Sequence, residues 1–334
     1  MSDRQQGIDD FLARAGWADA ERVPLAGDAS FRRYDRVRDG ERGAVLMNAP
    51  PPHEDVRPFI AIDRHLRNLG YSAPEIFAED VSLGTLLLED FGDDLFTRVL
   101  DSGGSELELY RHAVDLLIDL LHRDLPPAIP DYDIPTLLGE VALFVDWYLP
   151  TVRRQPVTST ERDGFFSAWQ EVLPLADMGP PVLVLRDYHV DNLVWLERRT
   201  GISRVGLLDF QDALVGSCMY DLVSLLEDAR RDLPPVLVKD MFERFISGTG
   251  LDPAAAATAY AVLGAQRNTK IIGIFTRLWQ RDGKIDYLPH ISRVWSLLEA
   301  GLEHPVLMPL RDWFDAHVPS QLRGTSITSS MAPS

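Results

Sequence analysis

The sequence predicts an α+β protein with two lobes, a small strand-rich lobe followed by a larger and mostly helical one. Short strand-like runs and one helical stretch occupy the first ~90 residues, after which apolar residues recur mainly at helical spacing. A third observation is a strand-rich island between residues 182 and 208, inside the helical part. The length of 334 residues agrees with two lobes, because one domain usually takes about 100–200 residues.

Composition narrows the class of partner. The chain has 33 Lys and Arg against 51 Asp and Glu, a net charge of −18, so we expect no nucleic-acid partner, because phosphate backbones bind basic surfaces. No apolar run reaches the roughly 18 residues of a membrane span, and the first residues lack a secretory pattern. The single cysteine, Cys218, cannot form an internal disulfide. We therefore expect a cytoplasmic protein with no membrane partner.

The first lobe is predicted from short apolar runs and one amphipathic stretch. Strands are expected at 31–37, 44–47 and 86–88, and a helix at 55–69. Glu89 to Gly92 follows the last of these strands and is typical of a connector. The predicted boundaries are 1–88 for the first lobe, 89–93 for the connector, 94–325 for the second lobe and 326–334 for a flexible tail.

Helical signals dominate the second lobe. Ser105 and Glu108 form a capping-box pattern that starts a helix over 105–122. Further helices are expected at 137–149, 161–174, 221–231, 235–248, 253–279 and 289–300. The island contributes strands at 182–185, 193–196 and 205–208, and Asp221 is expected to be the N-cap of the helix that follows.

Three polar residues stand where the island strands end. Asp187 and Asn192 are five positions apart in the loop after the first strand, and Asp209 ends the third. A buried carboxylate without a partner is costly, and Mg²⁺ prefers carboxylate, amide and phosphate oxygens. The pattern predicts a phosphoryl-transfer site in which Asp187 faces the acceptor hydroxyl while Asn192 and Asp209 hold the metal. The alternative is that these are ordinary turn residues of hairpin loops.

This stretch resembles the kinase fold in its aminoglycoside-phosphotransferase and choline-kinase branch, which carries His-Gly-Asp-x₄-Asn and then an Asp at a strand end. The resemblance implies a protein-kinase-like fold with a small antiparallel sheet in a nucleotide-binding N-lobe, and ATP and Mg²⁺ as cofactors. It assigns Asp187 as the catalytic residue and Asn192 and Asp209 as the metal ligands. Leu185 stands where the branch has His, and the position of Asp221 braces the catalytic loop in the family.

Two upstream segments resemble nucleotide-binding parts of the same branch. Leu86 to Gly92 resembles the hinge, in which the backbone of Glu89 and Phe91 would pair with adenine. Gly27 to Phe31, which includes Ser30, resembles the flap over the phosphates. Without the resemblance, the first segment is an ordinary strand followed by a turn, and the second is an ordinary loop.

The first lobe departs from the kinase fold by having no lysine. All three lysines lie later in the chain, and Met47 stands where the fold normally places the lysine that anchors the phosphates. Either the protein is a nucleotide-binding pseudokinase, or an arginine replaces the lysine. We expect Arg32 or Arg33 in that role, since a guanidinium binds phosphate oxygens bidentately, and Glu54 or Asp55 could orient it. The alternative is a solvated strand face.

Candidate acceptor-binding residues lie in three segments. Aromatic and acidic side chains between Phe144 and Pro150 suit a sugar, because they offer stacking faces and hydroxyl acceptors. His189 is either a brace of its loop or a substrate contact, and the cations at 267, 270 and 277 either pair with carboxylates or bind substrate. The candidates are Asp146, Tyr148, His189, Asn268 and Lys270.

From about residue 25 to 290 the chain is similar to one subgroup of the branch, the bacterial anomeric N-acetylmuramate/N-acetylglucosamine kinases of peptidoglycan recycling. The segments that carry this resemblance include 27–34, 46–51, 87–92, 185–192 and 266–270. The resemblance implies a small amino sugar as acceptor, and Lys270 or Arg267 could neutralise the lactyl carboxylate of N-acetylmuramate. An aminoglycoside, choline or homoserine as acceptor is the rival prediction.

Overall fold

The computed structural model describes residues 3–25 and 31–324, and its contacts divide the chain into two compact units. The first unit comprises Met1–Ala113 and Val190–Ala213, and the second comprises Val114–His189 and Leu214–Ser334. The division differs from the lobe boundaries expected at the connector, because residues 94–113 and 190–213 group with the N-terminal sheet. The expected tail, 326–334, lies outside the described residues. The predicted functional lobes, with their boundaries at the connector, stay a prediction.

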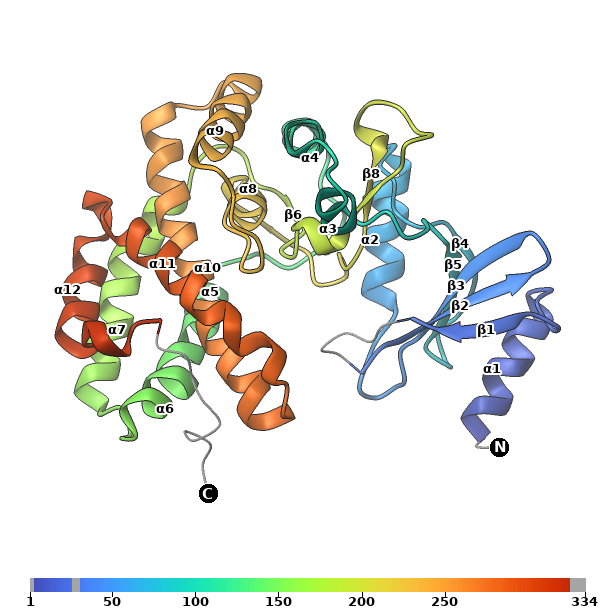
Figure 1. The fold of residues 1–334 in the computed structure, drawn as a ribbon, viewed down its shortest axis with the longest axis horizontal. Helices are drawn as coiled ribbons and strands as arrows, with labels where there is room; N and C mark the ends of the chain where they lie inside the picture. Colours follow the sequence, from blue (N-terminus) through green and yellow to red (C-terminus); the bar gives the residue numbers. More distant parts are fainter. Residues whose placement is uncertain (1–2, 26–30, 325–334) are drawn as a thin grey trace. The chain divides into compact units, whose positions relative to one another are not determined.

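The first unit is built on an antiparallel sheet (Figure 1). Its elements are α1 (Asp3–Arg14), β1 (Glu21–Pro24), β2 (Arg33–Asp39), β3 (Arg42–Asn48), α2 (Arg57–Asn68), β4 (Ile76–Asp80), β5 (Thr85–Glu89), α3 (Phe96–Asp101), the start of α4 (Glu106–Leu120), β7 (Leu193–Trp195) and β8 (Val205–Leu207). The sheet order is β1-β2-β3-β5-β4, with every neighbouring pair antiparallel. The prediction of a small antiparallel N-terminal sheet is confirmed.

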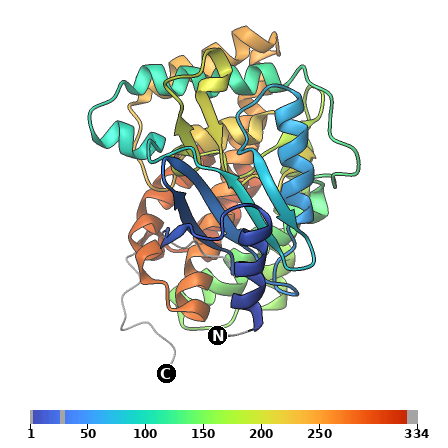
Figure 2. The ribbon, with the colours of Figure 1, turned by 90° about the vertical axis from the view of Figure 1, so that its right-hand side faces the viewer.

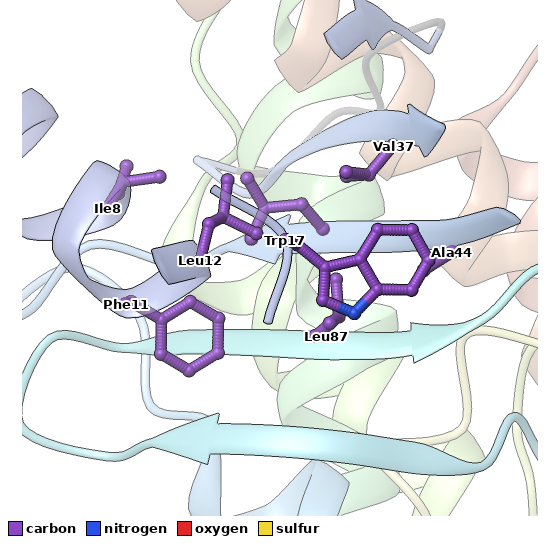
Figure 3. Packing of buried hydrophobic residues seen from close by; sticks show 8 residues of the cluster. Ile8, Phe11, Leu12, Trp17, Val37, Ala44 and Leu87 are labelled. Carbon is purple, nitrogen blue, oxygen red and sulfur yellow. The ribbon is translucent and has the colours of Figure 1, made fainter. Parts of the chain in front are cut away.

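The two faces of this sheet have different neighbours. Side chains alternate along a strand, so Ala44 and Leu46 of β3 point to one face and Val45 and Met47 to the other. On the first face, α1 lies across the sheet (Figure 2) and buries its apolar side chains against it (Figure 3). This core consists of Ile8, Phe11, Leu12, Trp17, Val37, Ala44, Leu46 and Leu87. The second face is left for α2 and for the cavity described below.

Helix α1 was not expected from the sequence, which predicts a single helix before the connector. Only Ile8, Phe11 and Leu12 of α1 are buried, while charged and amide side chains fill most of its other positions. So short an apolar stripe gives a weak periodic signal. Packing on the sheet stabilises the helix, as tertiary contacts do for most short helices.

The second unit is mostly helical, which confirms the prediction for the C-terminal part. It contains the end of α4, α5 (Ile134–Leu143), a π-helical turn (Phe144–Tyr148), α6 (Leu149–Arg153), α7 (Ser159–Val172), β6 (Val182–Val184), β9 (Leu214–Gly216), α8 (Met219–Leu226), α9 (Pro235–Thr249), α10 (Pro253–Asp282), α11 (Ile291–Leu302) and α12 (Met308–His317). None of the helices in the described ranges is long and apolar enough to cross a membrane.

Helix α10 is the central element of the second unit and packs against α5, α8 and α11 (Figure 1). Its start is capped by Asp252, whose carboxylate accepts the Ala255 N–H at 2.8 Å. Gly273 lies so close to α5 and the π-helical turn that a Cβ there would approach the backbone of Leu143 to 2.4 Å. Most residues of α10 from 256 to 279 are buried. The polar residues among them therefore need a specific explanation.

The island strands belong to two separate pairs, since β6 pairs with β9 and β7 pairs with β8. One sequence expectation about this region needs correction. Asp221 is not an N-cap, because α8 begins at Met219 after Cys218, so Asp221 lies inside its first turn. Asp187 and Asn192 still lie in the segment between β6 and β7, and Asp209 follows β8 by two residues.

Candidate active site

The first unit contains a cavity of about 320 Å³ on the Val45 face of the sheet. Its apolar lining comes from residues in or next to the five-stranded sheet, α2, the connector, β7 and β8 and consists of Leu25, Tyr34, Val45, Phe59, Pro74, Leu88, Phe91, Leu95, Val194 and Leu208. Asp191, Asn192 and Asp209 line the same cavity. An apolar lining with a few convergent polar groups is typical of a small-molecule site.

Residues of the predicted connector line this cavity, as expected for a nucleotide hinge. The Glu89 N–H donates to the Glu75 carbonyl at 2.8 Å, so the prediction that Glu89 pairs with adenine now depends on its carbonyl oxygen. The guanidinium carbon of Arg199 lies 5.1 Å from the ring centroid of Phe91, and Arg199 also pairs with the Glu89 carboxylate. A Cβ at Gly206 would come within 3.0 Å of the Phe91 ring. The Phe91 ring is thus held in one position against β8.

Arg36 links β2 to the connector. Its Nε lies 2.7 Å from Asp90 Oδ2 and its Nη1 lies 2.9 Å from Asp93 Oδ2. Hydrogen bonding to Asp93 raises the pKa of Arg36, as does the neighbouring Asp90, and they outweigh the effect of burial. All three residues line the cavity. The sequence places Arg36 on an expected strand. It does not predict that Arg36 pairs with Asp90 and Asp93, because both are more than fifty residues away in the chain.

The two predicted metal ligands face one cavity from two neighbouring turns. Asn192 ends a 3₁₀ turn before β7, and its carbonyl accepts the Leu208 N–H at 3.0 Å. This bond joins the turn to the segment that leads into Asp209. Asp209 has a backbone φ of 58°, in the left-handed region that few non-glycine residues adopt. Backbone strain of this kind is concentrated at functional sites. Here it occurs at a carboxylate residue that follows a buried strand and lines the cavity.

Arg32 lies beside Asp209. Its Nη1 is 3.6 Å from Asp209 Oδ1, its Nε is 3.5 Å from Glu54 Oε2 and its Nη2 is 3.8 Å from Asp212 Oδ2. Burial lowers the pKa of Arg32, but Tyr34 and then the three carboxylates raise it above its ordinary value. Arg32 is therefore a fixed cation next to a predicted metal ligand, with Glu54 positioned to orient it.

The other first-lobe candidates are placed differently. Arg33 is exposed on β2, so of the two arginines only Arg32 reaches the cavity side near Asp209. Met47, which occupies the lysine position, is 1% exposed. Ser30 and residues 27–29 of the expected flap lie outside the described residues.

In the second unit, Asp221 holds the loop that carries Asp187. Its carboxylate accepts the Leu185 N–H at 2.6 Å and the Arg186 N–H at 2.9 Å. Ser224 Oγ donates to the Arg186 carbonyl at 3.2 Å. Arg186 has a φ of 68°, so these bonds hold a backbone conformation that is strained for arginine. The bracing role that the resemblance implies for Asp221 matches this geometry, although its position in α8 does not match the expected N-cap.

The electrostatic surroundings keep Asp187 ionised. Burial raises the pKa of Asp187, but Lys270, His189, Arg267 and Arg186 together lower it below its ordinary value. A carboxylate in this state accepts hydrogen bonds and protons. Asp187 is therefore suited to orient a hydroxyl group and to receive its proton.

Glu140 of α5 is a buried carboxylate that sequence reasoning missed. It pairs with Arg186 and accepts a bond from Lys270 Nζ at 3.3 Å and from Gln266 Nε2 at 2.9 Å. Burial raises its pKa, but Lys270 and Arg186 lower it below the ordinary value. The available signal was that Glu140 is one of only two acidic residues in the otherwise apolar stretch 137–149. Glu140 thus fixes the loop arginine and the helix lysine with one charge.

The acceptor candidates differ in burial. Tyr148 is fully buried, its hydroxyl donates to the Leu322 carbonyl at 2.6 Å, and its ring packs on Trp295, so it is a core residue. Asp146 is exposed and pairs with Arg162 of α7. We therefore leave both residues out of the proposed sugar site.

The remaining acceptor candidates lie near α10 and the Asp187 loop. Lys270 Nζ already donates to Tyr220 at 2.8 Å and to Glu140, so two of its three N–H donors are in use. Asn268 Nδ2 donates to Glu227 Oε2 at 2.6 Å. His189 is 7% exposed, and burial lowers its pKa, which favours the neutral imidazole. These residues stay candidates.

The donor set in the cavity fits Mg²⁺. Asn192 offers an amide oxygen and Asp209 a carboxylate, the ligand types that this ion prefers. Within residues 3–25 and 31–324 there is no group of three or more His, Cys, Asp or Glu side chains suited to a metal. Mg²⁺ bound with a nucleotide needs only one or two protein carboxylates, because phosphates and waters complete its shell. The arrangement therefore suits a metal that arrives with phosphate.

A sheet over an apolar cavity, with an amide and a carboxylate among its lining residues, is the arrangement expected of a nucleotide-dependent phosphotransferase. The phosphotransferase enzyme family model matches residues 21–257, and the chain belongs to this family. ATP is the phosphate donor that the family implies.

Two relatives make the comparison more specific. A Caulobacter vibrioides protein named N-acetylmuramate/N-acetylglucosamine kinase is 34% identical, over 96% of this chain and 99% of its own. A Pseudomonas aeruginosa protein of the same name is 37% identical, over 88% of each chain.

Solved structures share the fold at low sequence identity. A choline/ethanolamine kinase family protein from Mesorhizobium loti has a TM-score of 0.63 at 13% identity, covering 92% of this chain and 99% of its own. A ternary complex of streptomycin, ATP and APH(2″)-IIa has a TM-score of 0.58 at 15% identity, covering 92% and 99%. The prediction of a kinase-like fold in the aminoglycoside-phosphotransferase and choline-kinase branch is confirmed.

Proposed function

We propose that this chain is an ATP-dependent kinase that phosphorylates the anomeric hydroxyl of N-acetylmuramate, N-acetylglucosamine or both. The observation that carries the proposal is the shared cavity of Asn192 and Asp209, with the cation Arg32 beside Asp209. The names of the relatives support the acceptor, because they match over most of both chains. A role in peptidoglycan recycling and a cytoplasmic location belong to the same proposal.

In this proposal the first unit binds the nucleotide. The apolar part of the cavity receives adenine beside Phe91, and the carbonyl of Glu89 pairs with it. Asn192 and Asp209 would hold Mg²⁺, which supplies positive charge to the phosphates when bound. Arg32 takes over the work of the absent lysine, and Glu54 takes over that of the acid that orients such a lysine. An arginine supplies this charge permanently, because its pKa stays far above neutrality.

Asp187 of the second unit acts on the acceptor. Its carboxylate accepts a hydrogen bond from the anomeric hydroxyl and orients the oxygen toward the γ-phosphorus. A bond forms between that oxygen and the γ-phosphorus, while the bond from the γ-phosphorus to the β–γ bridging oxygen breaks. The hydroxyl proton passes to Asp187 and then to solvent, and ADP leaves. Most of the rate enhancement comes from positioning and charge stabilisation rather than from covalent chemistry.

Arg32 also separates this proposal from a pseudokinase. Loss of the phosphate-anchoring charge would leave a nucleotide-binding module without turnover. The chain instead has a cation with 11% of its side chain exposed, close to Asp209 and Glu54. This placement supports an active enzyme.

An acceptor panel tests the proposal. The full-length protein is incubated with ATP and Mg²⁺ and with N-acetylmuramate, N-acetylglucosamine, an aminoglycoside, choline or homoserine, and ADP release is measured. We expect release with one or both amino sugars, and a product whose phosphate is released by mild acid, as anomeric phosphates are. Turnover on a different acceptor would refute the sugar assignment. A nucleotide-dependent thermal shift without any turnover would favour the pseudokinase.

A further inference from the structure

Arg267 of α10 is a buried cation with unused donors. Arg267 is 4% exposed, and its Nε and Nη1 have no hydrogen-bond partner among the described residues. Leaving donors of a charged group unpaired in the interior costs free energy. Arginine has no way to lose its charge at neutral pH. A group of opposite charge that enters the site with the substrate would pair with these donors.

The position of Arg267 is next to the proposed acceptor site. Arg267 and Lys270 are three residues apart on α10, so they lie on the same face of the helix. The charges of both act on Asp187, and that of Arg267 acts on His189 as well. Arg267 therefore belongs to the group of side chains around the carboxylate that would face the acceptor.

Lys270 and Arg267 differ in what they already bind. Lys270 Nζ donates to Tyr220 Oη at 2.8 Å and to Glu140 Oε1 at 3.3 Å, so its charge is balanced within the protein. Arg267 interacts electrostatically with Asp187, Asp221 and Glu227, but Nε and Nη1 hydrogen-bond to none of them. Lys270 keeps at most one donor hydrogen for a ligand, whereas two guanidinium nitrogens of Arg267 have no hydrogen-bond partner among the described residues.

We propose that Arg267 binds the carboxylate of an acidic amino-sugar acceptor and thereby sets the preference for N-acetylmuramate over N-acetylglucosamine. The inference rests on the proposed function and names a specificity residue within it. The two sugars differ by the lactyl ether on the ring, which carries the only carboxylate. A site with a buried, unsatisfied guanidinium discriminates against the sugar that leaves it unpaired, because that sugar offers no compensating bond.

A phosphate of ATP is the other anion that could pair with Arg267. The distribution of residues favours the sugar carboxylate, because Asn192, Asp209 and Arg32 belong to the first unit, whereas Arg267 belongs to the second with Asp187. The two sources give different kinetics. A phosphate contact would change the KM for ATP equally with either sugar, and a carboxylate contact would change only the kinetics of the acidic acceptor.

The test pairs a change in the protein with a change in the substrate. The kcat/KM is measured for N-acetylmuramate and for its neutral carboxamide with wild type, Arg267→Met, Arg267→Lys and the control Lys270→Met. We expect wild type to prefer the acid by about 10- to 100-fold, as for a hydrogen bond to a charged group. Arg267→Met should bring this ratio close to one, and Arg267→Lys should keep part of it. Lys270→Met should slow both acceptors and keep the ratio.

Several outcomes would overturn the proposal. They are an acid-to-amide ratio that survives in Arg267→Met, one that collapses in Lys270→Met instead, or a wild type that does not distinguish acid from amide. A higher KM for ATP with both sugars would assign Arg267 to the nucleotide. If Arg267→Met does not fold, as judged by thermal melting, the wild-type ratio and Arg267→Lys decide. Wild type that phosphorylates neither amino sugar would instead refute the proposed function itself.

Discussion

Arg32 of the first unit and Arg267 of the second are both largely buried arginines, but they differ in how close the nearest carboxylates lie. Arg32 has three carboxylates within 4 Å, of which Asp209 is a predicted metal ligand and Glu54 an orienting acid. Arg267 has two guanidinium nitrogens without a hydrogen-bond partner in the described part of the chain. Arg32 thus has carboxylates within ion-pairing distance, whereas none of the ion pairs in the described part of the chain includes Arg267.

This difference matches the two substrates of a kinase. A nucleotide brings its phosphates together with a metal, so the cation that meets it needs a fixed position and a local balance of charge. An acceptor that differs from its competitor by one carboxylate is recognised best by a site that is incomplete without that carboxylate. Buried arginines with and without a carboxylate at ion-pairing distance are therefore suited to different substrates of the same chain.

The largest expected effect tests whether Asp187 belongs to the acceptor side of this comparison. Asp187→Asn keeps the shape and removes the charge, so we expect kcat to fall by about 10²- to 10⁴-fold, as for loss of a general base. The KM for ATP should change little, because the proposed nucleotide contacts lie in the first unit. Steady-state kinetics with saturating sugar measure both quantities. Near-normal turnover would remove Asp187 from the role.

The next effect tests the nucleotide side. Arg32→Met removes the cation beside Asp209, and we expect kcat/KM for ATP to fall by about 10- to 100-fold, while Arg32→Lys retains part of it. Arg33→Met is the matched control, since it removes the same charge from an exposed position on the next residue. Equal losses in the two methionine variants would show that bulk charge, rather than the position of Arg32, matters.

The last effect is on stability rather than on turnover, and it concerns a buried group of the opposite charge. Asp63 of α2 is fully buried, and neither of its carboxylate oxygens has a hydrogen-bond partner among the described residues. Unlike arginine, an aspartate can become neutral. Burial raises the pKa of Asp63 from 3.8 to about 7, although Arg67 and Arg64 oppose the shift. We therefore interpret Asp63 as a protonated structural residue rather than as a second ligand site.

This interpretation fixes the sign of a pH effect on stability. The folded state keeps the Asp63 proton up to about pH 7, while the unfolded chain releases it near pH 3.8. The contribution of Asp63 to the free energy of unfolding is full below pH 3.8 and is lost as the pH rises to about 7. As the pH rises through this range, the free energy of unfolding of Asp63→Asn should therefore increase relative to that of wild type, by at most about 4 kcal/mol. Denaturant melts at pH 5 and pH 8 measure it, and a constant difference would contradict the assignment.

How much the sequence predicts depends on whether a feature is local. The strands near 44–47 and 193–196, the helix from 253 and the turns that carry Asp187 and Asp209 follow from local apolar patterns, and the structure has them. Spacing along the chain was enough to place Asn192 and Asp209 as a pair.

Features that depend on tertiary partners were not predictable. Glu140 becomes a shared counter-ion only because α5 lies against α10, more than a hundred residues away in the chain. The choice between Arg32 and Arg33 depends on which side of β2 meets Asp209. The contrast between Lys270 and Arg267 likewise depends on Tyr220 and Glu140, which bind one cation and not the other.

The central claim is that the γ-phosphate of ATP is transferred to the anomeric hydroxyl of an amino sugar. Phosphorus NMR of the reaction of the full-length protein with ATP, Mg²⁺ and N-acetylmuramate or N-acetylglucosamine tests it directly. The account predicts a product resonance coupled to the anomeric proton with wild type and no such resonance with Asp187→Asn over the same time. A phosphate attached to another hydroxyl, or no sugar phosphate with either acceptor, would contradict it.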